Sequence, residues 1–238
     1  MIYAGIVAGG RGTRLRSADM PKQFLEIGGL PIIVRTIRAF AGVGMIGLIY
    51  VAVNQEWLGY TEELFSSHGI DPQRVKIIPG GAMRQDSIMN IISAIEKDKG
   101  IDKGDILLTH DAVRPFVSRR IIEDNISCAA EKLSCGTYIP SEDTVVISEE
   151  GLTVDGGLDR SKLFRAQTPQ SFELSHLKDC IGRLKSRGDD LGAMTDTCSI
   201  ISACGKKVHI VLGDPMDFKI TTDYDLAVAR ALCENSDK

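Results

Sequence analysis

The stretch Ala8-Gly9-Gly10-Arg11-Gly12-Thr13-Arg14, with Pro21-Lys22-Gln23-Phe24 close behind it, decides the fold. An apolar run, residues 2–7, precedes it and predicts a buried β-strand. The three glycines allow the backbone to turn sharply and to approach a ligand closely, because no Cβ stands in the way. The N–H groups of such a loop form a concavity suited to phosphate oxygens, and Arg14 and Lys22 add two cations. The stretch therefore predicts a triphosphate site after the first strand.

The spacing of this loop differs from that of two commoner phosphate loops. A Walker A loop requires a second glycine followed by Lys and Ser or Thr, which this stretch lacks. A dinucleotide fingerprint requires a third glycine where Leu15 stands, so a dinucleotide-dependent oxidoreductase is disfavoured. A nucleotide-binding regulator on a degenerate transferase fold is disfavoured, because a sensor would not need Arg14, Lys22 and Lys219 together. A sugar-1-phosphate nucleotidyltransferase that uses UTP or GTP remains as an alternative.

Composition limits the class of protein. The formal net charge of −4 argues against a nucleic-acid-binding protein that relies on bulk positive potential. The chain is 43% hydrophobic and 25% charged, as expected of one ordinary globular domain that spans residues 1–238. No apolar stretch approaches the roughly 20 residues of a membrane span, and no signal peptide is indicated, so we expect a cytoplasmic protein without a membrane partner. None of the six cysteines forms a C-x-x-C pair, and we identify no metal ligand.

Strand-like and helix-like runs alternate along the first half of the chain. The expected strands are 2–7, 46–53, 75–79 and 105–109, and the expected helices are 31–41, 55–67, 84–97 and 118–132. This alternation predicts an α/β fold, a mostly parallel sheet with helices on both faces. Further helices are expected at 174–186, 191–204 and 223–234, and a further strand at 207–212.

A segment at about 137–160 interrupts this alternation. Two short apolar runs, Thr144-Val145-Val146-Ile147 and Leu152-Thr153-Val154, are joined by Ser148-Glu149-Glu150-Gly151 and predict a β-hairpin. Such an arm either covers a site or holds a second subunit, the alternative being an ordinary surface hairpin.

Three chain segments are expected to meet at the carboxyl ends of the parallel strands, where ligands bind in such sheets. They are the glycine loop, the turn at Gly80-Gly81 and the pair His110-Asp111. The turn can lie against a nucleobase, or it can be a simple loop. Asp111 can orient a substrate, and Arg114 can hold a phosphate through two N–H groups, unless the two form a structural ion pair.

The ordered motifs resemble the cytidylyltransferases that join CTP to a polyol phosphate. The resemblance spans nearly the whole chain and rests on the glycine loop, Pro21-Lys22-Gln23-Phe24, His110-Asp111-Ala112-Val113-Arg114-Pro115-Phe116, Gln167-Thr168-Pro169-Gln170-Ser171-Phe172 and Phe218-Lys219-Ile220-Thr221-Thr222. It implies a Rossmann-like nucleotidyltransferase fold and a homodimer held by the β-hairpin arm. It also implies Mg²⁺ held mainly by the CTP phosphates.

The resemblance also implies roles for individual residues. The catalytic cations would be Arg14, Lys22 and Lys219. The nucleotide-binding residues would be Ala8, Gly9, Gly10, Gly12, Gly80, Gly81, Asp86 and Ser87. The residues for the polyol phosphate would be Asp111, Arg114, Thr144, Arg160 and Thr168, with Thr144 and Arg160 reaching across from the arm of a second subunit.

The acceptor is predicted from smaller segments. Met1-Ile2-Tyr3-Ala4-Gly5-Ile6, Glu56-Trp57 and Asp143-Thr144-Val145-Val146 are more similar to the branch that uses D-ribitol 5-phosphate. The segment from Leu158 to Gln167 is more similar to the branch that uses 2-C-methyl-D-erythritol 4-phosphate. We expect ribitol 5-phosphate, with CDP-ribitol as product, and keep the methylerythritol acceptor of isoprenoid synthesis as the alternative.

Overall fold

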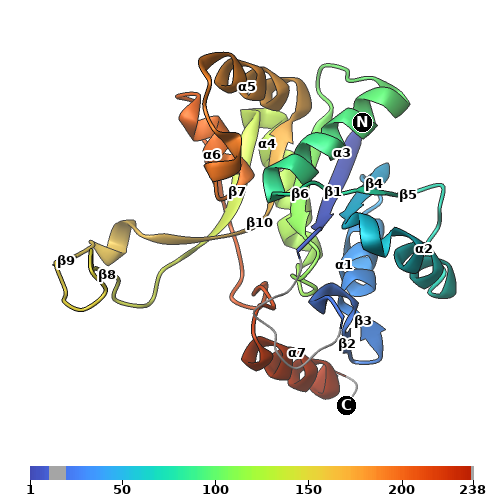
Figure 1. Ribbon diagram of the computed structural model, residues 1–238, viewed down its shortest axis with the longest axis horizontal. Helices are drawn as coiled ribbons and strands as arrows, with labels where there is room; N and C mark the ends of the chain where they lie inside the picture. The colour runs from blue at the N-terminus through green and yellow to red at the C-terminus, as the bar shows by residue number, and fades with distance from the viewer. Residues whose placement is uncertain (11–19, 237–238) are drawn as a thin grey trace.

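A seven-stranded sheet forms the centre of the computed structural model, which describes residues 1–10 and 20–236 (Figure 1). In spatial order its strands are β11 (His209–Leu212), β7 (Ser134–Pro140), β10 (Phe164–Glu173), β6 (Ile106–Asp111), β1 (Ile2–Ala8), β4 (Leu48–Val53) and β5 (Val75–Pro79). All neighbouring pairs are parallel except those of β10, which runs antiparallel to both β6 and β7. The mostly parallel sheet expected from the sequence is therefore confirmed.

Helices cover both faces of this sheet because its strands carry apolar side chains on both sides. On one face lie α1 (Ile32–Ala41), α2 (Leu58–Ser67) and α4 (Arg119–Lys132), and on the other lie α3 (Arg84–Lys99), α5 (Leu174–Arg187) and α6 (Thr197–Ala203). The isoleucines of α3 are buried against β1 and β4, as their spacing predicted. The last helix, α7 (Asp223–Ser236), packs against the small sheet of β2 (Glu26–Ile27) and β3 (Leu30–Pro31). None of the helices in the described part of the chain is long and apolar enough to cross a membrane.

The chain order of the strands reverses next to β1. From β1 the chain proceeds to β4 and β5 on one side, and then crosses back through α3 to place β6 on the other side of β1. Such a reversal leaves a crevice outside the carboxyl ends of the two strands, which is where ligands bind in open α/β sheets. Residues 9–10 and Asp111 lie at this point.

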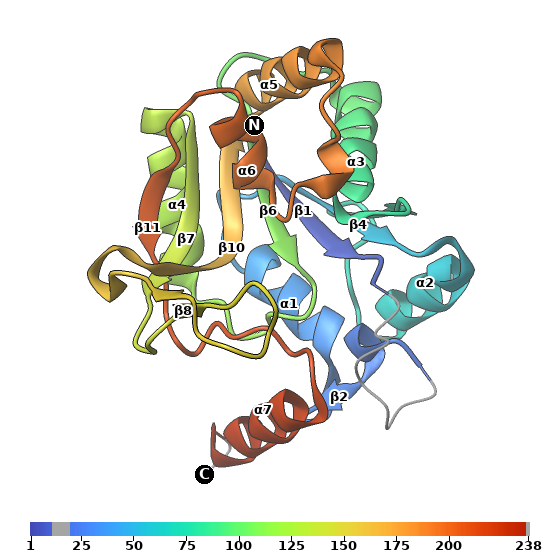
Figure 2. The same ribbon diagram turned by 60° about the vertical axis from the view of Figure 1, so that its left-hand side comes forward.

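Residues 141–163 form an arm that extends away from the sheet (Figure 1). The arm connects the end of β7 to the start of β10, and these two strands are neighbours in the sheet (Figure 2). Within the arm, β8 (Val146–Ile147) pairs antiparallel with β9 (Gly156–Gly157). The predicted hairpin is thus present, but the strand predicted at 152–154 is wrong. The returning strand begins four residues later than predicted, at Gly156, because Asp155 accepts a hydrogen bond from the Glu149 N–H and fixes a wider turn.

Three other differences from the predicted elements concern the second half of the chain. Strand β7 was not predicted, and it includes residues 137–140, which were expected to belong to the arm. Strand β10 was not predicted, because it is mostly polar and contains Pro169, which a strand in the middle of a sheet normally excludes. Its register with β7 shifts between Ala166 and Gln170, so the proline lies in an irregular part of the pairing. The helix predicted at 191–204 is instead a 3₁₀ turn, Leu191–Ala193, followed by α6, since Asp196 caps the latter with its carboxylate.

Candidate functional site

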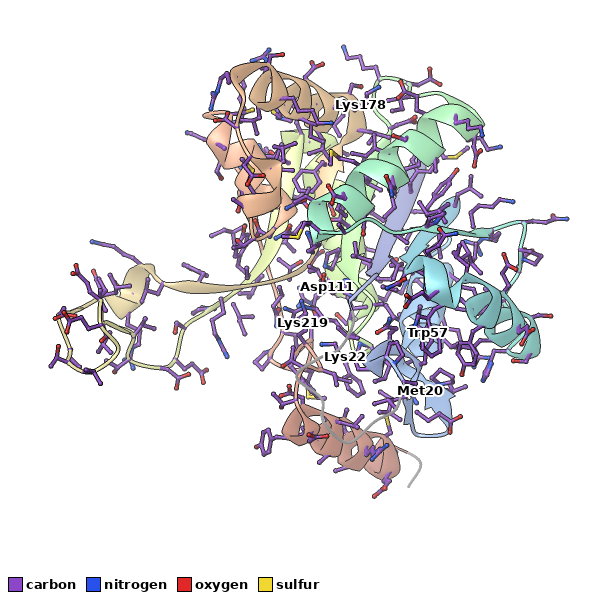
Figure 3. All side chains as sticks on the ribbon, in the orientation of Figure 1. Met20, Lys22, Trp57, Asp111, Lys178 and Lys219 are labelled. Atoms are coloured by element: carbon purple, nitrogen blue, oxygen red, sulfur yellow. The ribbon has the colours of Figure 1, made fainter. Side chains whose placement is uncertain are left out.

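A cavity of about 310 Å³ lies at the reversal point of the sheet. Its walls come from the end of β1, the 3₁₀ turn Lys22–Phe24, the start of α3, the end of β6 and the segment before α7. The described lining residues are Val7, Ala8, Gly9, Gly10, Lys22, Gln23, Gly81, Ala82, Met83, Arg84, Ser87, Asp111, Ala112, Val113 and Lys219. Figure 3 shows Asp111, Lys219 and Lys22 gathered near the end of β6. Segments far apart in the sequence therefore meet as the parallel-sheet rule predicted.

The segment Pro21-Lys22-Gln23-Phe24 is bonded to the end of β1. Gln23 is buried, and its side-chain Nε2 donates a 2.7 Å hydrogen bond to the carbonyl oxygen of Ala8. This contact ties Pro21-Lys22-Gln23-Phe24 to the end of β1 and places Lys22, itself only 9% exposed, in the cavity wall. The predicted residues Gly12 and Arg14 lie outside the described residues.

The second glycine turn is locked to the start of α3. The Gly81 N–H donates to the hydroxyl of Ser87 at 3.0 Å, and the Met83 N–H donates to the carboxylate of Asp86 at 2.9 Å. A Cβ on Gly81 would lie 2.1 Å from the Cβ of Asp86, so only glycine fits this turn. Gly81 and Ser87 line the cavity, whereas Gly80 and Asp86 do not. In the structure Asp86 acts as a cap of the first helical turn, and its contact with a ribose stays a prediction.

Asp111 is the centre of a cluster of cations. Its carboxylate accepts from Nε of Arg84 at 3.2 Å and from Nζ of Lys219 at 2.8 Å, while Nε of Arg114 lies 3.9 Å away. Burial of the carboxyl would raise its pKa, but Arg84, then Lys219, then Arg114 lower the pKa well below its ordinary range. Asp111 is therefore ionised, and two of its neighbours line the same cavity.

The guanidinium of Arg114 points into the protein. Its Nη1 donates a 2.6 Å hydrogen bond to the carbonyl oxygen of Asp217, and its Nη2 lies 3.5 Å from the carbonyl oxygen of Ala166. The side chain is buried and does not line the cavity. To grip a phosphate with two N–H groups it would have to release these carbonyls, so its role in acceptor binding stays a prediction.

Thr168 is likewise bonded inside the protein. Nε2 of His110 lies 3.1 Å from the carbonyl oxygen of Arg114, so this nitrogen carries the proton and donates. Burial lowers the pKa of His110 to about 3, so the ring is neutral and its Nδ1 accepts from the Thr168 hydroxyl at 2.9 Å. The same hydroxyl accepts from the Asp111 N–H at 3.2 Å. These bonds fix the end of β6, and direct contact of Thr168 with an acceptor stays a prediction.

Thr144 and Arg160 lie on the arm and do not line the cavity. Both are exposed, and Arg160 donates a hydrogen bond to the carbonyl oxygen of Glu142, also on the arm. One chain therefore does not bring these two residues to the other candidate site residues.

Sequence reasoning missed one cation of the site. Arg84 lines the cavity and contacts Asp111, but no role was predicted for it from the sequence. The signal that predicted Arg14 and Lys22, a glycine turn followed by a basic residue, is present there too. No cluster of three or more His, Cys, Asp or Glu side chains that could hold a metal occurs within residues 1–10 and 20–236.

Comparison with known proteins assigns the chain to a group of enzymes. The family model described as 2-C-methyl-D-erythritol 4-phosphate cytidylyltransferase matches residues 2–235. The solved structure of 2-C-methyl-D-erythritol 4-phosphate cytidylyltransferase from Thermus thermophilus is 26% identical, with a TM-score of 0.74, and the match covers 98% of this chain and 100% of that one. The enzyme of that name from Francisella tularensis is 26% identical, with a TM-score of 0.80 and coverage of 97% and 98%.

A third structure supports the fold alone. It is the 4-diphosphocytidyl-2C-methyl-D-erythritolsynthase from Anaerococcus prevotii, which is 24% identical with a TM-score of 0.82. The match covers 98% of this chain and 96% of that one, so the whole architecture, arm included, is of the nucleotidyltransferase type expected from the sequence.

Proposed function

The chain belongs to the 2-C-methyl-D-erythritol 4-phosphate cytidylyltransferase family, and we propose that it transfers CMP from CTP to 2-C-methyl-D-erythritol 4-phosphate. Membership makes it a CTP-dependent cytidylyltransferase, a nucleotidyltransferase enzyme. The family match over residues 2–235 carries the choice of acceptor. Ribitol 5-phosphate, which smaller sequence segments favoured, has no support in the comparisons, and the alternative acceptor fits them better.

The proposed reaction is a displacement at the α-phosphorus of CTP. An oxygen of the acceptor phosphate forms the new bond to this phosphorus, and the bond to the bridging oxygen of the β-phosphate breaks. The electron pair leaves with pyrophosphate. The acceptor phosphate is already an anion near neutral pH, so no general base is required. The main barrier is the electrostatic repulsion between the two phosphate-bearing substrates. Cations that are already in position, in a site that excludes water, lower this activation barrier.

The geometry supports a division of this work among the cavity residues. Gly9 and Gly10 follow β1 and line the cavity, where their backbone would take the triphosphate. Lys22 stands beside them, and we propose that it stabilises charge on the reacting phosphates, together with Arg14. Lys219 also lines the cavity, next to Asp111, and we propose that it receives the acceptor phosphate.

The side chains that line the cavity indicate how Mg²⁺ would be held. Asp111 is the one carboxylate among the described lining residues, and it is already paired with Arg84 and Lys219. These residues do not form a metal site by themselves, so we propose that the CTP phosphates supply most of the ligands. The ion, when bound, would neutralise phosphate charge.

We also propose that the enzyme is a homodimer in which the arm completes a neighbouring site. Apolar side chains on the arm are exposed in the single chain, which is costly unless another surface covers them. They are Val146, Ile147, Leu152, Val154 and Leu158. Thr144 and Arg160 lie on the same arm and lack access to the cavity of their own chain.

Pyrophosphate release tests the proposed function. The protein is incubated with CTP and Mg²⁺, and with either 2-C-methyl-D-erythritol 4-phosphate or ribitol 5-phosphate. Release only with the methylerythritol acceptor is the expected result. Release only with ribitol 5-phosphate would overturn the acceptor assignment and leave the cytidylyltransferase activity intact. The same assay with UTP, GTP and ATP in place of CTP tests the preference for the nucleotide. A Lys22→Ala variant, purified in the same way, is the control for contaminating activity.

A further inference from the structure

Arg84 connects three parts of the site through one guanidinium. It is the first residue of α3 and lies three residues after Gly81. Its Nε donates to Oδ1 of Asp111 at 3.2 Å, and its Nη1 donates to the hydroxyl of Thr197, at the start of α6, at 3.1 Å. Its Nη2 is buried and has no hydrogen-bond partner within the described residues. A guanidinium presents its donors in fixed directions, so this contact with two acceptors also fixes where the Asp111 carboxylate points.

The two oxygens of Asp111 have different partners. Oδ1 is held by Arg84, and Oδ2 is held by Nζ of Lys219 at 2.8 Å. Arg84 is the more enclosed partner, with 21% of its side chain exposed, whereas 37% of the Lys219 side chain is exposed. Arg114 is the third cation near Asp111, but its Nε is 3.9 Å from Oδ2, beyond hydrogen-bond distance, and its other nitrogens hold carbonyls.

This arrangement bears on how Lys219 can bind a substrate. An ammonium that turns toward an incoming phosphate must loosen its hold on Oδ2. Removing the partner of a buried carboxylate costs free energy. If Lys219 were the main partner of Asp111, this cost would keep Lys219 bonded to Oδ2. Arg84, which stays on Oδ1, supplies the remaining compensation.

We propose that Arg84 is a positioning residue that keeps Asp111 paired, so that Lys219 is free to move from Oδ2 of Asp111 to an oxygen of the phosphate acceptor. This inference rests on the proposed function for the identity of the acceptor. The inference adds to the proposed function a role for Arg84. This residue lies at the start of α3, next to the turn proposed to bind the nucleotide, and it would affect acceptor binding through Asp111.

The kinetic test compares Arg84→Gln in two backgrounds. With Asp111 present, Arg84→Gln should lower kcat/KM for the acceptor by about 10- to 100-fold, the range for loss of one charge-assisted hydrogen bond. The loss in kcat/KM for the acceptor should exceed any change in the Kd of CTP, because the ion pair between Arg84 and Asp111 acts on Lys219. In an Asp111→Asn background the same substitution should change kcat/KM by less than about threefold, because the carboxylate that captures Lys219 is gone. Equal losses in both backgrounds would overturn the proposal.

Thr197→Val is the matched control for a purely structural role. It removes the acceptor of Nη1 but leaves the ion pair between Arg84 and Asp111. If Arg84 served only to tie α3 to α6, Thr197→Val would reproduce the kinetic loss, and the proposal would be wrong. We expect kcat/KM close to that of the unmodified protein. Arg84→Met, which removes the charge and keeps much of the length of the side chain, takes the place of Arg84→Gln if that variant does not fold.

A second readout is independent of turnover. The rate at which limiting acetic anhydride labels Lys219, measured by peptide mass spectrometry, reports how firmly its amine is paired. Arg84→Gln should slow this labelling, and Asp111→Asn should speed it in the presence or absence of Arg84. An unchanged labelling rate in Arg84→Gln would refute the inference. If neither acceptor is turned over by the unmodified protein, the proposed function fails, and the labelling result still decides the role of Arg84.

Discussion

Asp217 should make the protein less stable as the pH rises, and Asp217→Asn should remove that effect. The side chain is fully buried, and neither carboxylate oxygen has a hydrogen-bond partner within the described residues. Its backbone carbonyl, in contrast, accepts from Arg114 and from Gln167. Burial raises the pKa of the Asp217 carboxyl to about 8, with Asp111 and Asp214 adding to the shift and Arg114 opposing it.

The direction of the effect follows from proton binding. Between pH 4 and about pH 8 the folded protein retains the Asp217 proton and the unfolded chain has lost it. The folded state therefore binds more protons in this window, and the free energy of unfolding falls as the pH rises through it. The difference between 3.8 and about 8 corresponds to roughly 6 kcal/mol at about 1.4 kcal/mol per pH unit. Relaxation and water entry reduce such penalties, so we expect about 2 kcal/mol at pH 9.

Urea unfolding of the unmodified protein and of Asp217→Asn at pH 5, 7 and 9 measures this effect. The variant should be more stable by about 2 kcal/mol at pH 9, and the difference should shrink toward pH 5. Carboxylates elsewhere titrate equally in both proteins, so they cancel in the difference. A difference that does not change with pH would refute the reasoning, since it would mean that Asp217 is ionised and compensated in the folded protein.

Three further changes test the site and one tests the core. Lys22→Ala should lower kcat by about 10²- to 10³-fold in the pyrophosphate assay with little change in the urea midpoint, and an unchanged kcat would remove Lys22 from the catalytic residues. Mixing Lys22→Ala with Arg160→Ala should restore about a quarter of full activity if the arm acts across a dimer, because half the dimers are mixed and each has one intact site of two; no recovery would contradict the arm's role. Gly81→Ala should weaken CTP binding in calorimetry by about 1–3 kcal/mol, since the added Cβ overlaps Asp86 and displaces the turn. Phe40→Ala, at a fully buried position, should lower the free energy of unfolding by about 3–5 kcal/mol, and a loss below about 1 kcal/mol would show that the core refills the space.

The parts of the fold that the sequence predicted are those fixed by local pattern. Strands β1 and β5 and helix α3 combine apolar periodicity with a glycine boundary, and their predicted positions agree closely with the structure. Strand β10 depends instead on other segments of the chain, among them the start of α6, which supply partners for its polar residues. Gln170, for example, donates to Asp196 and accepts from the Thr197 and Cys198 N–H groups. No local pattern indicates such partners.

The same distinction applies to the site. The rule that the carboxyl ends of parallel strands meet at one edge correctly predicted that Gly9, Gly81 and Asp111 line the same cavity. It does not say which way a side chain turns once it is there. Arg114 follows the same strand end as Asp111, but it points inward because the carbonyl of Asp217 offers it a buried acceptor. The orientation of Arg114 is decided by a residue more than a hundred positions later in the chain, which the sequence pattern does not reveal.

The net charge of the whole chain and the charge of the cavity have opposite signs. The chain as a whole has a formal net charge of −4, which excludes binding of polyanions by bulk potential. Within the described lining of the cavity, however, Lys22, Arg84 and Lys219 face one carboxylate, Asp111. A concave site with this excess of cations concentrates field lines, which favours the binding of phosphate-bearing substrates. The positive character of the cavity therefore comes from where these cations lie and not from the net charge of the chain.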